Sequence, residues 1–230
     1  MPGTARLRPD KRRTYRLRKG PALFLLPPLS DSIIVDDWIK TKWEVTRRYC
    51  RFDMLEAMEF CASDYGTEVD RILGLDGSGL RPMPLAPLGC ASEEARAELK
   101  RWKARELFPG AYSAEGALAG LYLYFSCLDE AHAIAQDLNT SEGSYWHGIM
   151  HRQEPDAANA GYWFRQVGRH PVFAELRLPG DREWDPFEFI ELCETARVRP
   201  GSDEEALAMR LQSVEWQRLF DYCARGKASH

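Results

Sequence analysis

Apolar side chains recur at helical spacing over most of the chain. The pattern begins near Asp36, where Trp38, Ile39 and Trp43 follow one another at near-helical intervals. No segment alternates apolar and polar residues convincingly, as a half-buried strand does. The pattern therefore predicts an all-α protein.

Several of the predicted helices have clear start signals. A side chain that can accept a hydrogen bond from the first turn stands at each start, and these N-caps are Ser92, Asp156, Asp185 and Ser202. The helix after Ser92 is expected to reach about Leu107, because Pro109 and the following glycine end it. The last helix is expected to run from Asp203 to Cys223 or Ala224.

Two helix-loop-helix segments, residues 116–138 and 144–167, follow the same order of small and acidic residues. Small residues stand at Ala119 and Gly148, and the alanines Ala131 and Ala160 are 29 positions apart. This order resembles the tetratricopeptide or Sel1-like hairpin, in which small residues let two antiparallel helices approach closely. The resemblance implies a single domain of antiparallel helical hairpins, which we place at residues 31–226.

Composition and charge limit the class of protein. Of the 230 residues, 44% are hydrophobic, which is enough to bury a core and excludes a disordered chain. No apolar run approaches the roughly 20 residues of a membrane-spanning helix. Residues 1–20 hold eight Lys and Arg against Asp10, a charge of +7, so the remainder carries −11 of the net −4. We predict a basic, disordered tail at residues 1–30, through which alone nucleic acid could bind, and expect none on the acidic body.

The six cysteines lie far apart and form no Cys-x-x-Cys pair: Cys50, Cys61, Cys90, Cys127, Cys193 and Cys223. They occupy segments that otherwise form apolar helix faces, as buried thiols do. Reduced thiols are typical of an intracellular protein. We therefore expect unpaired cysteines and a cytoplasmic location.

Residues 144–165 combine histidines, carboxylates, arginines and large aromatics more densely than a structural hairpin requires. A helix is expected from about Ser144 to Gln153. Its apolar side is formed by Tyr145, Trp146, Ile149 and Met150. His147 and His151, four positions apart, share the opposite side. Because the apolar side is expected to pack on the next helix, the histidines are predicted to face a pocket or groove.

Two imidazoles at this spacing suit acid/base chemistry or metal binding. The predicted catalytic residues are His147, His151 and Glu154, since a carboxylate that holds an imidazole forms a proton shuttle. Gly148 stands where the zinc-protease helix has its general-base glutamate, so a site without a metal is favoured. If a divalent metal binds, the predicted ligands are His147, His151 and His132, with Glu154, Asp156 and His170 as further candidates.

Other polar and aromatic residues of the region are predicted to contact a ligand: His132, Arg152, Asp156, Asn159, Tyr162 and Trp163. Structural roles stay open for several of them. Asp156 is an apt N-cap, Arg152 suits an ion pair with a carboxylate, and Trp163 suits the core or the lining of a groove.

The segment from Trp146 to Trp163 also resembles an uncharacterised family of bacterial and fungal proteins. The shared signature is Trp-His-x-x-x-His-Arg-x-Glu-x-Asp-x-x-Asn-Ala-x-Tyr-Trp. The Trp-Asp-Pro-Phe sequence at residues 184–187 and the Glu-Trp pair at residues 215–216 are similar to that family too. The resemblance implies no particular activity.

These observations predict a soluble helical protein whose His/Arg/carboxylate pocket binds a small polar or anionic ligand, with acid/base catalysis by histidine. Two alternatives stay open. One is a tetratricopeptide-like scaffold whose groove binds a protein or peptide, and the other is a metal-dependent hydrolase or oxygenase. Convergence of His132 or His170 on the pair His147 and His151 would favour the pocket, whereas a long open groove would favour the scaffold.

Overall fold

Ten α-helices form most of the chain that the computed structural model describes, residues 60–226. They are α2 (Thr67–Leu73), α3 (Glu93–Leu99), α4 (Ala104–Leu107), α5 (Ala114–Tyr124), α6 (Leu128–Ala135), α7 (Ser141–Gln153), α8 (Ala157–Val167), α9 (Pro171–Ala174), α10 (Pro186–Arg197) and α11 (Asp203–Ala224). Short 3-10 helices span Ala62–Tyr65 and Gly74–Gly79. The all-α prediction is confirmed. The predicted tail and the helical pattern near Asp36 lie outside the described residues.

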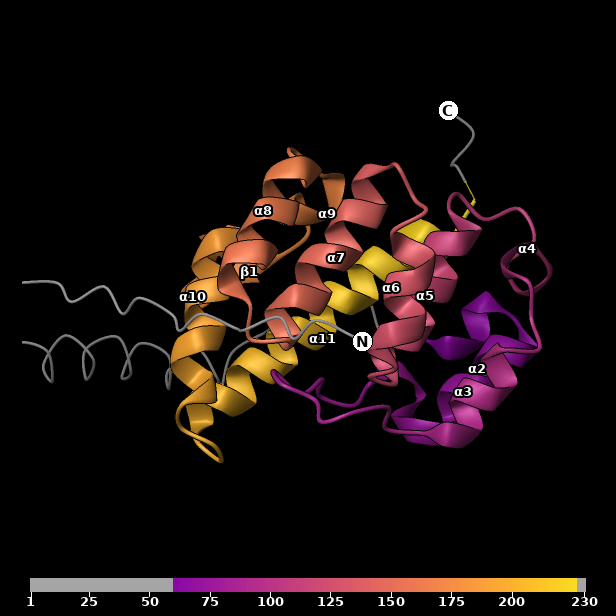
Figure 1. Cartoon of the computed structure of the whole chain (residues 1–230), viewed down its shortest axis with the longest axis horizontal. Helices are drawn as coiled ribbons and strands as arrows, with labels where there is room; N and C mark the ends of the chain where they lie inside the picture. The colour runs from indigo at the N-terminus through magenta and orange to yellow at the C-terminus, as the bar shows by residue number, and fades with distance from the viewer. Residues whose placement is uncertain (1–59, 227–230) are drawn as a thin grey trace, which may run out of the picture. The chain divides into compact units, whose positions relative to one another are not determined.

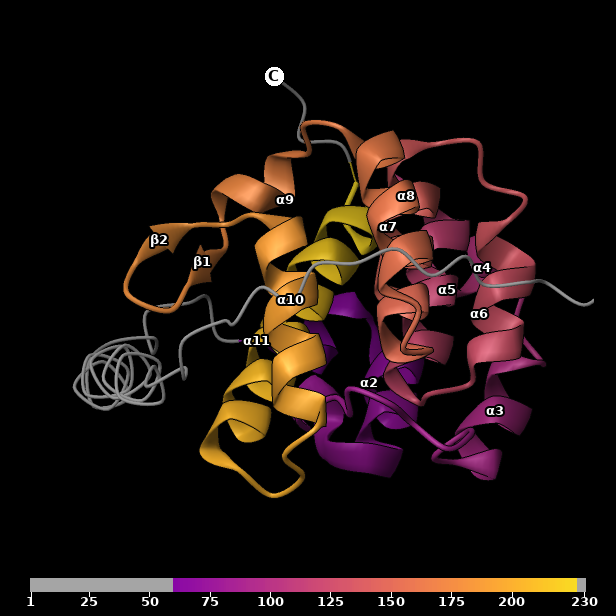
Figure 2. The ribbon, with the colours of Figure 1, turned by 60° about the vertical axis from the view of Figure 1, so that its left-hand side comes forward.

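The helices pack in contacting pairs. Short turns join α5 to α6 and α7 to α8, and within each pair the two helices are in contact. Figure 1 shows these four helices side by side, with α11 running across behind them, and Figure 2 shows α10 against α11 from another side. The indole of Trp216 on α11 donates a hydrogen bond to the carbonyl of Gly120 on α5, at 2.7 Å. The domain is thus built around α11 and two helical hairpins.

The apolar side of α7 lies in the core, as predicted. Its buried side chains are Tyr145, Trp146, Ile149 and Met150. Gly148 allows α8 to approach, because a Cβ at this position would lie 2.8 Å from the ring of Phe164. Ala160, Phe164 and Val167 supply the buried stripe of α8. Trp163, for which the core and the lining of a groove were both left open, is partly buried and stacks on His147.

The predicted N-caps are all confirmed. Ser92, Asp156, Asp185 and Ser202 each accept a hydrogen bond from a backbone amide of the first turn. The last helix ends at Ala224, within the predicted range.

The predicted helix from Ser92 to Leu107 is wrong, because the chain breaks between α3 and α4. Leu99, Ala104 and Leu107 are all buried. Successive residues of a helix are turned by about 100°, so a continuous helix would direct Leu99 and Ala104 to different sides. The break lets both reach the core.

The only strands within residues 60–226 are two short ones, β1 (Arg177–Leu178) and β2 (Arg182–Glu183). They pair antiparallel, with Arg177 opposite Glu183 and Leu178 opposite Arg182. Figure 2 shows this hairpin at the edge of the helical domain. Among the described helices, none combines the length and the apolar character needed to cross a membrane.

The prediction of unpaired cysteines is wrong at one pair. Cys90 and Cys127 form a disulfide between the connector before α3 and the first residue ahead of α6. Cys193 and Cys223 are free and buried, as expected, whereas Cys61 is free and exposed. The pairing depends on a contact between segments that are 37 positions apart, which spacing along the chain does not reveal.

An ion pair between α7 and α11 lies in the core. The guanidinium of Arg152 contacts the carboxylate of Glu215, and both side chains are fully buried. Arg152 also donates to Gln212 at 3.2 Å and lies 4.4 Å from the ring centre of Phe189. Burial opposes the charge on Arg152, but the nearby carboxylate outweighs it and keeps the pKa of Arg152 above its usual value.

Substituting one partner of this ion pair should destabilise the protein far more than substituting both partners by apolar residues. We expect Arg152→Met alone to lower the free energy of unfolding by about 3 to 5 kcal/mol, because the carboxylate of Glu215 is left buried without its partner. Adding Glu215→Leu should restore most of that loss. Urea unfolding of both single variants and the double variant measures the coupling. A double variant as unstable as the sum of the two single losses would contradict a specific pair.

Candidate functional site

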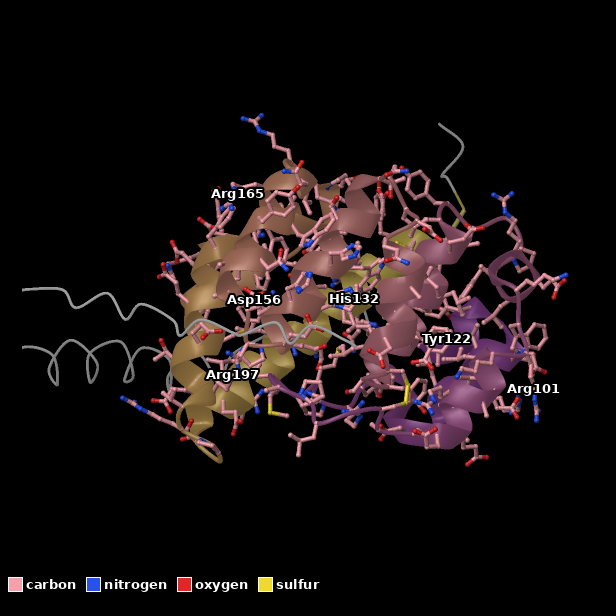
Figure 3. All side chains as sticks on the ribbon, in the orientation of Figure 1. Arg101, Tyr122, His132, Asp156, Arg165 and Arg197 are labelled. Atoms are coloured by element: carbon pink, nitrogen blue, oxygen red, sulfur yellow. A yellow bond between two sulfur atoms is a disulfide. The ribbon has the colours of Figure 1, made fainter. Side chains whose placement is uncertain are left out.

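Two histidines of α7 and the residue that follows this helix lie away from its apolar side, although His147 is itself buried. His147, His151 and Glu154 are spaced at i, i+4 and i+7, so they lie along one line of the helix surface. Helix α6 packs against this line and contributes His132. Figure 3 shows His132 and Asp156 on the same face of the molecule, one on either side of α7. The fold therefore brings His132 to the predicted histidine pair.

Glu154 joins the two helices through both of its carboxylate oxygens. One oxygen lies 3.2 Å from Nε2 of His132, and the other lies 2.8 Å from Nδ1 of His151. The three side chains each offer a ligand atom, and these atoms all lie within 4.8 Å of one another. The side chains are 25%, 15% and 36% exposed for His132, His151 and Glu154, so solvent reaches the cluster.

His147 lies beside these three residues and is held from two directions. Its Nδ1 donates a hydrogen bond to the carbonyl of Gly143 at 3.0 Å. The indole of Trp163 stacks on its ring, with centroids 4.1 Å apart and planes 14° apart. Because a carbonyl oxygen only accepts, Nδ1 carries the proton and Nε2 carries the lone pair.

Two polar residues near the cluster are Asn159 of α8 and Asp156, the N-cap residue of that helix. Nδ2 of Asn159 lies 3.3 Å from both ring nitrogens of His151. Asp156 is exposed and its Oδ1 accepts from the backbone amide of Asn159 as the N-cap of α8. Asn159 therefore lies at the predicted site, whereas Asp156 has the structural role that we left open and adds negative charge nearby.

Burial lowers the pKa of His147 and of His151. Positive charge on either ring is also disfavoured by the neighbouring histidines, while Glu154 acts in the opposite direction. Burial thus favours the neutral form of both imidazoles. Neutral imidazoles with a free lone pair are the form that binds a metal ion.

Two of the predicted site residues lie elsewhere. Arg152 is turned into the core toward Glu215, so the prediction that it contacts a ligand at this site is not supported. It follows His151 directly, and one step along a helix turns a side chain by about 100°. Tyr162 is exposed and touches the cluster only through the edge of Trp163.

His170 does not join the cluster. It is buried at the N-terminus of α9, where its Nε2 lies 3.6 Å from the carboxylate of Glu142. We did not predict this pair, although the acidic residue in the first turn of α7 is a visible signal. Of the two histidines that could have approached His147 and His151, only His132 does so.

A cavity of about 590 Å³ lies at another place in the domain. Its lining includes Phe164, Phe173, Trp184 and Phe187, and none of the clustered histidines belongs to it. The histidine cluster is therefore a partly exposed site between α6, α7 and α8 and does not belong to this cavity.

No protein-family model, curated protein or solved structure matches the chain. The resemblances to the tetratricopeptide hairpin and to the family with the Trp-His signature thus stay predictions. The chemistry of the cluster has to be inferred from its own geometry.

The buried pair of Glu142 and His170 should make the free energy of unfolding decrease as the pH falls. Burial opposes ionisation of Glu142, but the nearby imidazole of His170 and the hydrogen bond from the hydroxyl of Ser141 outweigh it and lower the pKa of Glu142 to about 2. The folded pKa lies below the unfolded value, so the stabilisation is complete above the unfolded pKa of about 4.3 and is lost as pH falls toward 2.

We therefore expect the wild type to lose of the order of 3 kcal/mol more than Glu142→Gln between pH 5 and pH 2, on the basis of about 1.4 kcal/mol per pKa unit. Denaturant unfolding at a series of pH values measures the difference. If the wild type and Glu142→Gln lose the same stability between pH 5 and pH 2, ionisation of Glu142 does not stabilise the fold.

Proposed function

We propose that the chain is a metal-dependent hydrolase in which His132, His151 and Glu154 bind one divalent transition-metal ion. The observation that carries this proposal is the convergence of two imidazoles and one carboxylate from two helices within 4.8 Å. Two histidines and one glutamate are the protein ligands of several catalytic zinc sites, and they leave a coordination position open for water.

The contacts of Glu154 explain how an ion would fit. Without an ion, its two oxygens accept N–H hydrogen bonds from His132 and His151. An ion would take the place of these two hydrogens, with each ring carrying its proton on the other nitrogen. The lone pairs of both rings and the carboxylate then face one point, with no change in the charge of the side chains.

The exposure of the site supports hydrolysis over oxygen chemistry. A bound divalent metal lowers the pKa of its water to about 7 and so supplies hydroxide at neutral pH. The proposed ligands are partly exposed, so bulk water would reach a bound ion. Enzymes that activate oxygen usually exclude water from the site, because water reacts with their intermediates. This is why we place the hydrolase ahead of the oxygenase.

The charge of the site favours a polar or anionic substrate. A divalent ion with one carboxylate and neutral histidines would have a net charge of +1, partly offset by the exposed Asp156, and would attract the oxygen of an ester, amide or phosphate group. The scaffold alternative has less support, because the polar side chains converge on one point between α6 and α7.

Metal content tests the proposal. The full chain without a histidine tag, dialysed against zinc and then against buffer, should retain about one zinc per chain. Glu154→Gln and His132→Ala should each retain less than about 0.2 zinc per chain. A site with three protein ligands loses most of its affinity for the metal when one of these ligands is removed. Glu183→Gln, which changes an exposed carboxylate on β2, is the matched control and should bind zinc like the wild type.

Activity adds a second measurement. Zinc-loaded wild type should hydrolyse p-nitrophenyl acetate, an activated ester, faster than the metal-free protein and faster than Glu154→Gln. A folded wild type that retains no zinc, cobalt, manganese or iron would contradict the metal site. Hydrolysis by such a protein would support acid/base catalysis by the same residues without a metal.

A further inference from the structure

A third histidine, His147, lies close to the two histidines that the proposed metal site contains. The ring centroids of His132 and His151 are 5.0 Å apart, those of His132 and His147 are 5.3 Å apart, and those of His147 and His151 are 6.1 Å apart. The three rings thus form a compact triangle that spans α6 and α7.

A shared metal ion would require this spacing. With metal–nitrogen distances of about 2.0 to 2.1 Å, two imidazoles on one tetrahedral ion have ring centroids roughly 5 Å apart, and two on opposite sides have them roughly 6.4 Å apart. All three measured distances fall within or next to that interval. The spacing of the three rings is therefore compatible with one shared ion.

His147 also has the support that a ligating histidine needs. Its Nδ1 is occupied by the carbonyl of Gly143, and its ring is fixed against Trp163. Metal-binding histidines usually donate their other nitrogen to a carbonyl or carboxylate, which fixes the tautomer and the ring orientation. Only Nε2 of His147 is left for coordination.

We infer that His147 is a fourth protein ligand, so that the ion is bound by three histidines and one glutamate. His147 lies outside the closest set of ligand atoms, so binding would require its Nε2 to move toward the ion. The inference rests on the proposed metal site and adds to it. Three neutral nitrogens and one carboxylate oxygen, with no thiolate, favour zinc, iron or cobalt over the softer copper(I).

Proton NMR of the cobalt(II) protein tests this inference without reference to activity. The N–H proton of an imidazole that binds cobalt(II) through its other nitrogen is shifted far outside the normal range by the unpaired electrons. The wild type should show three such exchangeable resonances, from His132, His147 and His151. His147→Gln should show two, and its affinity for cobalt(II) should fall at least about tenfold.

His170→Gln is the matched control, because it changes the other histidine among residues 60–226 and should keep all three resonances. His147→Ala provides a second reading, and thermal melts identify which variants are folded. Two resonances in the wild type, unchanged by either substitution at His147, would overturn the inference and leave the three-ligand site intact. No shifted resonance and no cobalt binding in the wild type would overturn the metal site itself.

Discussion

The buried ion pair between Arg152 and Glu215 fixes how α7 is rotated in the domain. Neither charge can reach water, so each depends on the other, with Gln212 of α11 as a further acceptor for Arg152, and this holds α7 in one orientation against α11. Residues one step apart on a helix differ in direction by about 100°. With Arg152 held in the core, His147 and His151 are directed toward α6 and α8. The position of the candidate site thus follows from an interaction on the other side of the same helix.

The site combines a local and a long-range contribution. Spacing along α7 brings His147, His151 and Glu154 into line, and packing of α6 adds His132. Glu154 then links the two helices through two short contacts. Gly148 contributes indirectly, because the absence of a Cβ allows α8 to approach and to place Trp163 against His147. The close approach of α8 that Gly148 permits therefore also helps to hold the neighbouring imidazole of His147.

Much of the fold could be predicted from the sequence because its signals are local. The caps at Asp156, Asp185 and Ser202 and the buried side of α7 follow from hydrogen bonding and helical periodicity within a few residues. Predictions failed where distant segments decide. The break after Leu99 satisfies the core, and the disulfide of Cys90 depends on a contact with the start of α6. Arg152 was predicted to contact a ligand, whereas its partner is Glu215, which lies 63 positions away on α11.

Crystallography with cobalt(II) tests the central claim most directly. Crystals of the full chain soaked in cobalt(II), with data collected at the cobalt absorption edge, reveal the ion by anomalous scattering without any assumption about the reaction. Our account predicts one strong peak about 2 Å from a ring nitrogen of His132, a ring nitrogen of His151 and a carboxylate oxygen of Glu154. A map with no peak between α6 and α7, or with peaks only at other surface groups, would contradict a metal site in this protein.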